Sequence, residues 1–180
     1  MVSRETAALK DFEGRIEGSR GIPADAGNEA ELRAAIREFG AAEVLVYNAS
    51  AGHAGPATAL GVEDAITDFK VNALGAVVAT QEVVPAMRAA GRGTILFTGG
   101  GLALQPMAQL ASLSMGKAAI RNLTFAMAEE LEPAGIHVAT VTVCGFVQPG
   151  TKFDPDKIAE VYQALHEQPR DKWEREVIFK

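Results

Sequence analysis

The amino-acid sequence predicts an α/β fold in which helices cover both faces of a doubly wound parallel sheet. Three observations support this fold class. Segments with helical periodicity alternate with short apolar runs, as they do where helices connect parallel strands. Residues 43–47 form a nearly continuous apolar run, which a strand buried on both faces requires. The chain has 180 residues, 48% hydrophobic and 22% charged, which suits one globular domain over residues 1–180.

The first half of the chain is expected to alternate helices and strands. The expected elements are a helix over 3–13, a short strand over 22–24, a helix from 28 to 39, a strand over 43–47 and a helical region over about 62–90. Asn28 is expected to cap the second helix, with Glu31 completing a capping box. Gly75 and Pro85 interrupt the long helical region but need not end it.

The second half is expected to continue the alternation. The expected elements are a strand over 94–97, a glycine loop over 99–101, a helix over 111–131, a strand over 137–143, a helix over 155–168 and a short strand over 174–179. Four apolar residues of the helix over 111–131 recur at steps of three, four and four, which predicts one buried face. They are Ile120, Leu123, Met127 and Leu131.

The charge balance argues against two classes of partner. The chain has 17 Lys and Arg residues against 23 Asp and Glu residues, a net charge of −6, and it contains no basic run. We therefore expect neither nucleic acid nor a membrane as a partner. The sequence also shows no apolar signal core at its start and no apolar stretch of membrane-spanning length.

Cys144 is the only cysteine, so the chain has no internal disulfide and no cysteine-rich metal site. We expect a reducing, cytoplasmic setting and no bound metal. No histidine is patterned to activate the thiol. We therefore interpret Cys144 as a small apolar residue at the end of a buried strand rather than as a nucleophile.

Ligands of open parallel sheets bind beyond the carboxyl ends of the strands, so the residues just after each strand are candidates for a site. These are Asp25, residues 48–52, residues 98–101 and residues 144–151. The dinucleotide-binding turn G-x-G-x-x-G is absent, because the glycines at 99–101 have the wrong spacing and Gly18 and Gly21 follow no strand. No phosphate cradle can be identified in this sequence.

Several short motifs, taken together and in order, resemble the short-chain dehydrogenase/reductase family over nearly the whole chain. The segment Leu45-Val-Tyr-Asn48-Ala-Ser50 looks like the family's Asn-Asn-Ala-Gly segment, with Asn48 at its second Asn. Asp25 stands where the family has an Asp bordering the adenine pocket. Asn72 resembles the helix Asn that supports a catalytic water, and Lys117 resembles the active-site Lys that holds the nicotinamide ribose. The resemblance implies a Rossmann-like fold and an oxidoreductase linked to NAD or NADP.

The chain departs from the family pattern at the positions that perform the chemistry. Leu113 stands at the position of the catalytic Tyr, four residues before the Lys, and Gly100 stands at that of the catalytic Ser. The family's Pro-Gly after the sixth strand reads Cys144-Gly145. Residues 2–4 look like the end of the family's second strand, where Arg4 matches an Arg that often meets the phosphate of NADP. The chain is therefore expected to lack the first strand, the glycine turn and the first helix.

Each matched residue also has a structural interpretation. Lys117 has apolar neighbours on its helix, which favours a functional origin over a solvated charge. For Asn72, a role in satisfying backbone groups and a catalytic role are equally supported. A tie between neighbouring loops is the favoured interpretation of Asn48. Asp25 is also a good turn residue, and Arg4 is also typical of a solvated charge near a terminus.

No residue of the sequence clearly replaces the missing phenol. Ser114 stands three residues before Lys117 on nearly the same helical face, with Ser112 nearby, but an unassisted serine is a poor acid at neutral pH. His53 and Tyr47 have no partner that the sequence defines. Water is therefore the expected proton donor, and carbonyl chemistry is expected to be altered or weak.

Two functions remain open at this stage. The first is a divergent oxidoreductase of this family, acting on a small-molecule substrate and binding NAD or NADP weakly because the glycine turn is missing. The alternative is a catalytically inactive homologue that pairs with itself or a relative through the helices at 62–90 and 111–131. Fold alone does not decide between them.

A homo-oligomer is expected from the topology. In the doubly wound strand order, the missing strands would lie between the strand at 22–24 and the strand at 43–47. Residues 44–47 would then have an unpaired apolar edge, which favours pairing with another chain. Either the segment around Ile22 moves in to pair with this edge, or a second copy covers it, or association through the long helices partly shields it.

Overall fold

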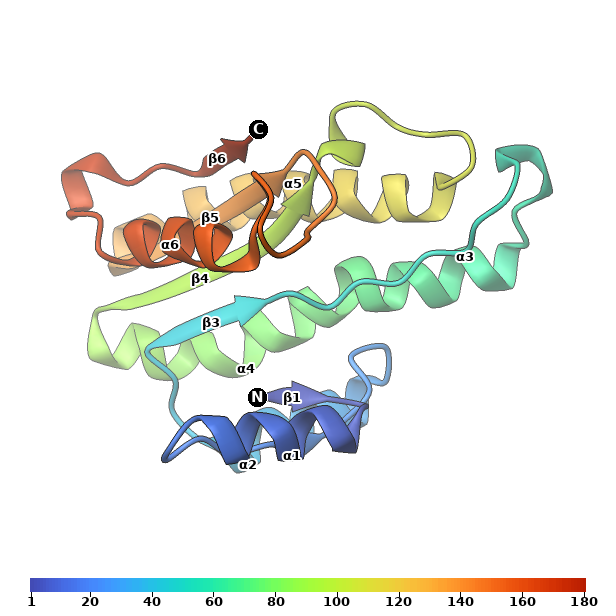
Figure 1. The fold of residues 1–180 in the computed structure, drawn as a ribbon. Helices are drawn as coiled ribbons and strands as arrows, with labels where there is room; N and C mark the ends of the chain where they lie inside the picture. The colour runs from blue at the N-terminus through green and yellow to red at the C-terminus, as the bar shows by residue number, and fades with distance from the viewer.

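The structure is a computed structural model that describes residues 1–180, and it consists of parallel strands with helices on both faces (Figure 1). The strands are β1 (Val2–Ser3), β2 (Ile22–Pro23), β3 (Val44–Tyr47), β4 (Gly93–Gly100), β5 (Ile136–Val143) and β6 (Glu176–Phe179). The α-helices are α1 (Thr6–Arg15), α2 (Glu29–Phe39), α3 (Val62–Phe69), α4 (Gly75–Ala90), α5 (Ala111–Leu131) and α6 (Pro155–His166). The predicted fold class is confirmed.

The strands form two separate sheets. One has four strands in the order β3-β4-β5-β6, and the other contains only β1 and β2. Every pairing is parallel, and the β4–β5 pair is the longest, running from Gly93 opposite Ile136 to Gly100 opposite Val143. The two central strands, β4 and β5, are almost fully buried and carry the carboxyl ends at which a site is expected.

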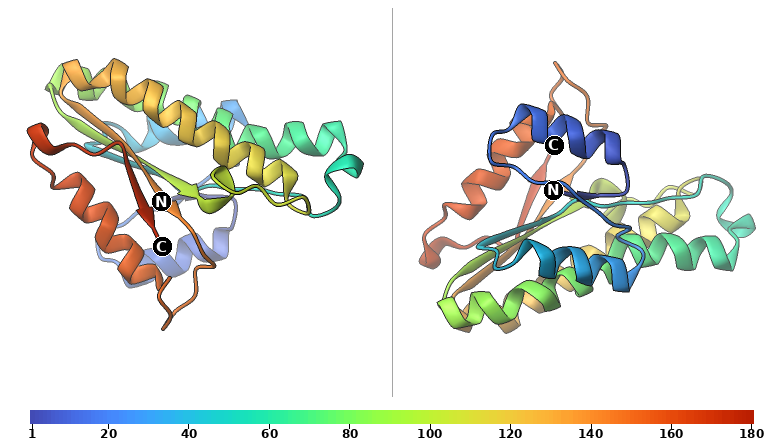
Figure 2. Two further views of the ribbon diagram at one scale, coloured as in Figure 1. Left: turned by 90° about the horizontal axis from the view of Figure 1, so that it is seen from above. Right: turned by 90° about the horizontal axis from the view of Figure 1, so that it is seen from below.

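The helices are divided between the two faces of the sheets. Figure 2 shows α2, α4 and α5 on one face and α1 and α6 on the other. The larger apolar core lies under the first group and includes Met87, Ile95 and Leu131, while a smaller core lies under α6 around Leu165. The predicted face of α5 is confirmed at Ile120 and Leu131, which are buried, and Leu123 and Met127 pack against the same core.

The long helical region is continuous from α3 to α4 through one π-helical turn, Lys70–Leu74. The Tyr47 hydroxyl donates to the carbonyl oxygen of Val71 at 2.5 Å within this turn. A side chain at Gly75 would collide with that hydroxyl, so the glycine permits the close approach of β3 to the helix. Tyr47 therefore has a partner that the sequence did not define. Burial raises the pKa of its hydroxyl.

Several predicted boundaries are wrong. The first helix begins at Thr6 rather than at residue 3, because the backbone of residues 2–3 pairs with β2. The predicted glycine loop over 99–101 is strand up to Gly100, and only a 3-10 turn, Gly101–Ala103, follows it. At Gly99 a Cβ would lie 2.7 Å from the hydroxyl oxygen of Thr140. The absence of a side chain therefore lets β4 pair with β5 beside this threonine.

The C-terminal elements are also shorter than predicted. Helix α6 ends at His166 rather than at 168, and β6 begins at Glu176 rather than at 174. Cys144 follows β5 directly as a free cysteine. No helix of the chain has both the length and the apolar character needed to cross a membrane.

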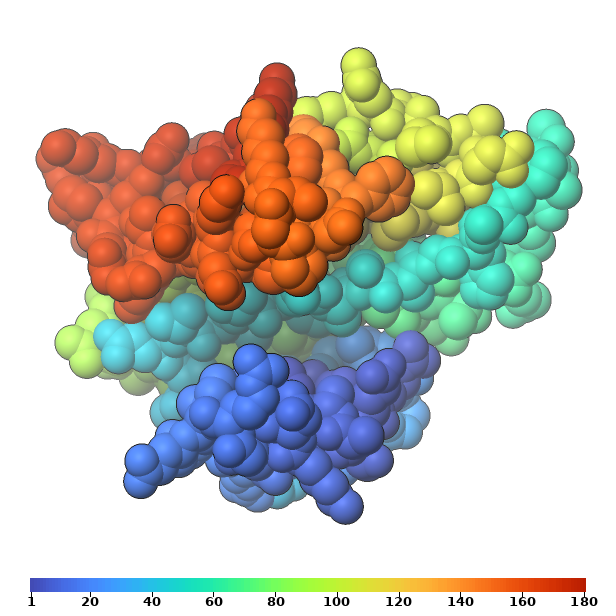
Figure 3. All heavy atoms as spheres, viewed as in Figure 1, coloured from blue at the N-terminus to red at the C-terminus, as the bar shows by residue number.

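The expected unpaired edge is present at β3, which pairs with β4 alone. Val44 is 37% exposed and Val46 is 50% exposed, and the segment around Ile22 pairs with β1 instead of filling the gap. A cleft of about 480 Å³ lies between the start of the chain and β3. Figure 3 shows the matching furrow between the N-terminal block, drawn in dark blue, and the rest of the molecule.

Candidate active site

Asn72 holds the loop that follows β3. Its side-chain Nδ2 donates to the carbonyl oxygen of Ala51 at 2.7 Å, and its Oδ1 accepts from the Ala51 backbone N–H at 2.9 Å. Asn72 is only 3% exposed and lies in the π-helical turn. Both hydrogen-bonding ends of the amide are therefore engaged with backbone, which supports the structural interpretation of this residue.

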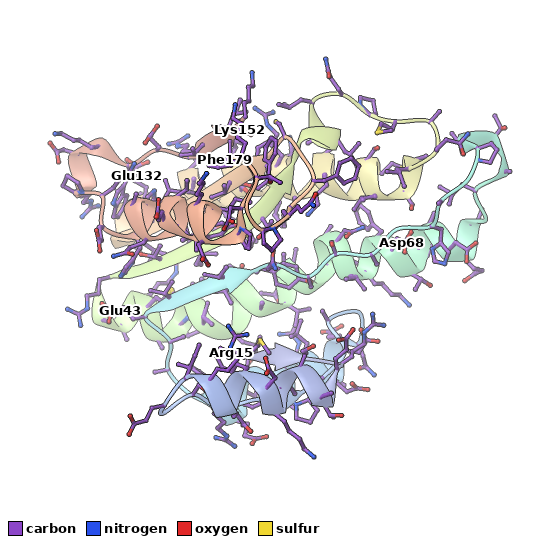
Figure 4. All side chains as sticks on the ribbon, viewed as in Figure 1. Arg15, Glu43, Asp68, Glu132, Lys152 and Phe179 are labelled. Carbon is purple, nitrogen blue, oxygen red and sulfur yellow. The ribbon has the colours of Figure 1, made fainter.

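A second side chain of the same helix, one turn earlier, holds the next part of the loop. Asp68 lies on α3 beside this loop and is 1% exposed (Figure 4). Its Oδ2 accepts from the backbone N–H of His53 at 2.8 Å and lies 3.0 Å from the ring Nδ1 of His53. The same backbone N–H is 3.2 Å from the hydroxyl oxygen of Ser112 on α5. The side chains of Asn72, Asp68 and Ser112 therefore hold the loop after β3 against two helical segments.

The ionisation of this cluster follows from its hydrogen bonds. Burial alone would raise the pKa of the Asp68 carboxyl, but hydrogen bonds from Ser112 and His53 outweigh it and hold that pKa below its usual value. The same bond to Asp68 raises the pKa of His53, with a smaller contribution from Asp64, whose carboxylate lies 3.6 Å from Nε2. The pair of an ionised Asp68 and a protonated His53 is therefore favoured.

The sequence analysis missed Asp68 and gave His53 no partner, and the structure corrects both points. Asp68 stands four residues before Asn72, so the two side chains project from the same face of the helix. The sequence did offer one sign of this role, because Asp68 is an acidic residue that stands between the apolar residues Ile66 and Phe69. Its partner, at position 53, could not be identified from local sequence.

Lys117 lies on α5 at the carboxyl end of β4. Its Nζ donates to the carbonyl oxygen of Thr98 at 2.8 Å, and no carboxylate pairs with it. The carbons of its stem lie 3.5 Å from where a Cβ on Gly100 would be. Burial lowers the pKa of the Lys117 amine to about 8. The structure thus brings Lys117 to the edge at which the sequence analysis expected a site.

Leu113 lies one helical turn before Lys117. A Cβ on Gly52 would lie 3.0 Å from the Cβ of Leu113, so the loop after β3 passes directly over this side chain. A Cβ on Gly116 would lie 2.5 Å from the Cβ of Asn72, so the absence of a side chain lets α5 meet the π-helical turn closely. The loop after β3 therefore covers Leu113, and α5 lies close to the π-helical turn beside it.

Asp25 and Arg4 form a second group, in the cleft between β1 and β3. Arg4 Nη1 lies 3.6 Å from Asp25 Oδ2, and both residues line this cleft. Asp25 Oδ1 accepts the backbone N–H of Gly27 at 2.8 Å, so the turn interpretation of Asp25 also fits. Asn28 caps α2 as predicted, accepting from the backbone N–H groups of the first turn.

The predicted capping box at Asn28 is wrong in one detail. Glu31 Oε2 accepts from the backbone N–H of Asp25 at 3.0 Å, whereas the N–H of Asn28 donates to the carbonyl oxygen of Asp25. The tight turn before the helix satisfies the Asn28 N–H, which leaves the Glu31 carboxylate to bond one turn further back.

Asn48 does not tie neighbouring loops together, in contrast to the favoured interpretation. Its side chain is exposed and makes no hydrogen bond, and it lines the same cleft as Arg4 and Asp25. Asn72 provides the tie instead. The predicted site residues therefore divide into a cleft group of Arg4, Asp25 and Asn48 and a helix group of Asn72 and Lys117.

Comparison with known proteins identifies the family. A family model described as short chain dehydrogenase matches residues 5–159. The chain belongs to the short-chain dehydrogenase family. It is 31% identical over 156 residues to human 17-beta-hydroxysteroid dehydrogenase type 1, covering 77% of this chain and 47% of that protein. It is 41% identical over 100 residues to the very-long-chain 3-oxoacyl-CoA reductase of Aspergillus niger, covering 54% of this chain and 29% of that protein.

Solved structures agree with the family assignment. A short-chain dehydrogenase from Rhodopseudomonas palustris superposes with a TM-score of 0.87 at 26% identity, covering 99% of this chain and 84% of that chain. A 3-ketoacyl-(acyl-carrier-protein) reductase from Brucella melitensis, complexed with NADH, gives 0.88 at 25% identity and covers 98% and 84%. A metagenomic member complexed with NADP gives 0.85 at 26% identity and covers 98% and 82%. The chain is thus a member of an oxidoreductase family with nicotinamide-bound relatives.

The residues of this chain fit the two ends of a nicotinamide nucleotide better than its middle. Lys117 Nζ donates one hydrogen bond to the carbonyl oxygen of Thr98 and has no counter-ion. Its other two N–H groups are free to donate to ribose hydroxyls. Arg4 and Asp25 offer a cation and a carboxylate in the cleft. No glycine-rich turn between a strand and a helix N-terminus offers backbone N–H groups to a pyrophosphate in residues 1–180.

Proposed function

We propose that this chain binds a nicotinamide nucleotide, NAD(H) or NADP(H), beyond the carboxyl ends of β3 and β4 and is a weak oxidoreductase of small carbonyl or alcohol compounds. The observation that carries the proposal is Lys117, a half-buried amine with a single backbone acceptor and no carboxylate partner. A lysine in such a setting has hydrogens to donate to a ligand at the edge of the sheet where ligands of this fold bind.

The bound nucleotide supplies the hydride, and the protein supplies orientation and a proton. Lys117 would orient the ribose next to the nicotinamide, and Arg4 and Asp25 would hold the adenosine end. Leu113 and Gly100 offer neither a phenol nor a hydroxyl where the family places its catalytic Tyr and Ser. The proton therefore comes from water, and the loss of a positioned acid costs about 10²- to 10⁴-fold in rate.

We expect this chain to bind the nucleotide weakly. The pyrophosphate carries the charge of the nucleotide, and residues 1–180 offer it no set of convergent backbone N–H groups. Calorimetric titration of the chain with NADPH and with NADH tests both statements. Weak saturable binding supports the proposal. The absence of any saturable binding would contradict the nucleotide site, and tight binding would contradict the argument from the pyrophosphate.

The same titration with the Lys117→Met variant tests whether the nucleotide binds at Lys117. The change keeps the length of the stem but removes the donor, so we expect nucleotide binding to weaken about tenfold, the value of one hydrogen bond. Lys157→Met is the matched control, because Lys157 also donates to a backbone carbonyl, that of Thr151 at 3.3 Å, but lies on the exposed surface. Equal affinity in both variants would remove Lys117 from the proposed site.

A second candidate function rests on the free edge of β3. The backbone groups of Glu43 and Leu45 face β4, so those of Val44 and Val46 face away from β4 at the free edge, as alternation in a parallel ladder requires. An exposed edge with apolar side chains favours pairing with a second copy of the chain. The chain would then serve as a subunit, with or without enzymatic activity, as a homo-oligomer.

Light scattering together with hydrogen exchange tests this second candidate. An oligomer predicts a mass above 18.9 kDa and slow exchange of the Val44 and Val46 amides that becomes faster on dilution. A monomer with rapidly exchanging amides at both positions would show that no second copy covers the edge. The titration with nucleotide does not depend on this outcome, so the two proposals fail separately.

A further inference from the structure

His137 is a histidine enclosed in the fold near the start of β5. It is 2% exposed, and its ring lies parallel to that of Trp173, with the ring centres 4.8 Å apart. The other two histidines of the chain, His53 and His166, are both exposed. His137 is therefore the one histidine whose protonation would place a charge inside the fold.

The hydrogen bonds of the His137 ring determine which nitrogen carries its proton. Nε2 lies 2.9 Å from the carbonyl oxygen of Glu174, and a carbonyl oxygen only accepts, so Nε2 carries the hydrogen of the neutral ring. Nδ1 is buried and has no hydrogen-bond partner. Protonation would add a charge and a second N–H group at this enclosed nitrogen.

Burial has the largest effect on the ionisation of this ring. It lowers the pKa of His137, and the carbonyl oxygens of Glu174 and Leu165 offset it only in part. The carboxylate of Glu174 also favours the protonated ring, but its Oε2 accepts from the side-chain amide of Gln168 at 2.6 Å. The closed fold therefore favours the neutral ring.

Two cationic side chains near the ring act in the same direction. The Nδ1 of His166, at the end of α6, lies 2.9 Å from the hydroxyl oxygen of Thr94, which stands opposite His137 in the sheet. A charge on His166 lowers the pKa of His137 further. The guanidinium of Arg170 lies 5.8 Å from the centre of the Trp173 ring, on which His137 stacks. Both groups therefore oppose a charge on His137.

The segment that covers His137 is the connection between α6 and β6, residues 167–175, which we call the C-terminal segment (Figure 1). Its outer contacts are made by two exposed arginines. Arg170 donates to the carbonyl oxygen of Glu132 at 2.7 Å, and Arg175 pairs with the Glu132 carboxylate at 3.0 Å. The stack of Trp173 on His137 is thus the part of the attachment that lies inside the fold.

We propose that His137 is a pH-sensitive switch that holds the C-terminal segment on β5 while its ring is neutral and releases the segment when the ring is protonated. The neutral ring stacks on Trp173 and donates to the Glu174 carbonyl. The protonated ring is more stable in water, which it reaches only when the segment opens. This inference is independent of the proposed nucleotide binding.

The direction of the switch follows from the protons bound in each state. The open state binds a proton with a pKa near the ordinary 6.5, whereas burial lowers the pKa of His137 in the closed state. The open state therefore binds more protons between these two values, and closure is lost as the pH falls below 6.5. The opening constant should rise by up to about tenfold for each pH unit in this range.

Hydrogen exchange of the whole chain between pH 8 and pH 5 tests the proposal. Mass spectrometry of peptides from the C-terminal segment gives the opening constant, once each rate is divided by the intrinsic exchange rate at that pH. In the parent the constant should be level above pH 7 and rise below 6.5. An opening constant that does not change with pH would overturn the proposal.

Two variants assign the pH dependence to one ring. His137→Phe keeps an aromatic ring beside Trp173 but takes up no proton, so the segment should open more at every pH, with no further rise below 6.5. His166→Gln is the matched control, because it removes a nearby exposed histidine and should leave the rise in place. The opposite pattern in the two variants would show that His166, not His137, is the switch.

Nitrogen NMR of the parent chain gives a readout that needs no variant. At pH 7.5 the His137 ring should carry its hydrogen on Nε2, with Nδ1 unprotonated. On acidification the ring should take up its proton below pH 6.5. A hydrogen on Nδ1 at pH 7.5, or a titration midpoint at or above 6.5, would contradict the proposal even if the His137→Phe variant does not fold.

Discussion

Replacing Lys117 by methionine should stabilise the folded chain at neutral pH. Burial lowers the pKa of this amine from 10.5 to about 8, which corresponds to a cost of roughly 3 kcal/mol for keeping the ammonium in the fold. The variant also loses the hydrogen bond to Thr98, worth about 1 kcal/mol. The half-buried position of the side chain reduces the cost further by screening, so we expect a net gain of roughly 1 kcal/mol at pH 7.

The pH dependence of this gain has a definite sign. The unfolded chain keeps the Lys117 proton up to about 10.5, whereas the folded chain releases it near 8. The unfolded state therefore binds more protons between these values, and the parent chain gains stability there as the pH rises. The variant does not share this gain. Its advantage at pH 7 should shrink through this range and become a deficit of about 1 kcal/mol above it.

Equilibrium unfolding in urea, followed by the fluorescence of Trp173 and by circular dichroism, measures the difference at pH 7 and at pH 10. Lys157→Met is the control, because an exposed lysine should give a difference near zero at both values. A variant at Lys117 that loses the same stability at pH 7 and pH 10 would refute the reasoning, since it would show that the ammonium is not penalised in the fold.

Three further outcomes follow from the packing around the site. Gly116→Ala should destabilise the chain by about 1–3 kcal/mol, because its Cβ would lie 2.5 Å from that of Asn72, and a thermal melt measures this. Asp68→Asn should speed hydrogen exchange at the His53 amide, and in the parent the stabilisation from Asp68 should be lost only as the pH falls through its lowered pKa. Val46→Lys should lower the oligomeric mass if a second copy pairs at β3.

Local patterns were enough to predict the elements that depend on one stretch of chain. Helix α5 runs over Ala111–Leu131, as its apolar periodicity predicted, because both its period and its length are properties of those residues alone. The end of β4 could not be predicted in the same way. Gly99 and Gly100 resemble a loop in isolation, and only the neighbouring strand, with Thr142 opposite Gly99, makes them extended.

The predicted site residues show the same division. Lys117 was named through its resemblance to the family's lysine, and its contact with the carbonyl oxygen of Thr98, 19 residues earlier, places it at the carboxyl end of β4. The partners of Asn72 and Asp68 lie 21 and 15 residues earlier in the chain, and no periodicity links such positions. The pairing of Arg4 with Asp25 likewise depends on how two short strands lie together.

Because the two sheets are separate, no strand pairing joins the first forty residues to the rest of the molecule. No ladder of strand hydrogen bonds joins β1 and β2 to β3, so this part is held by the packing of α2 on α4 and by Arg33 and Arg37, which both bind the nearly buried carboxylate of Glu82. These charged contacts hold the pKa of Glu82 below its usual value. We therefore expect the N-terminal part to open more easily than the four-stranded sheet, and a protease to cut first at residues 40–43.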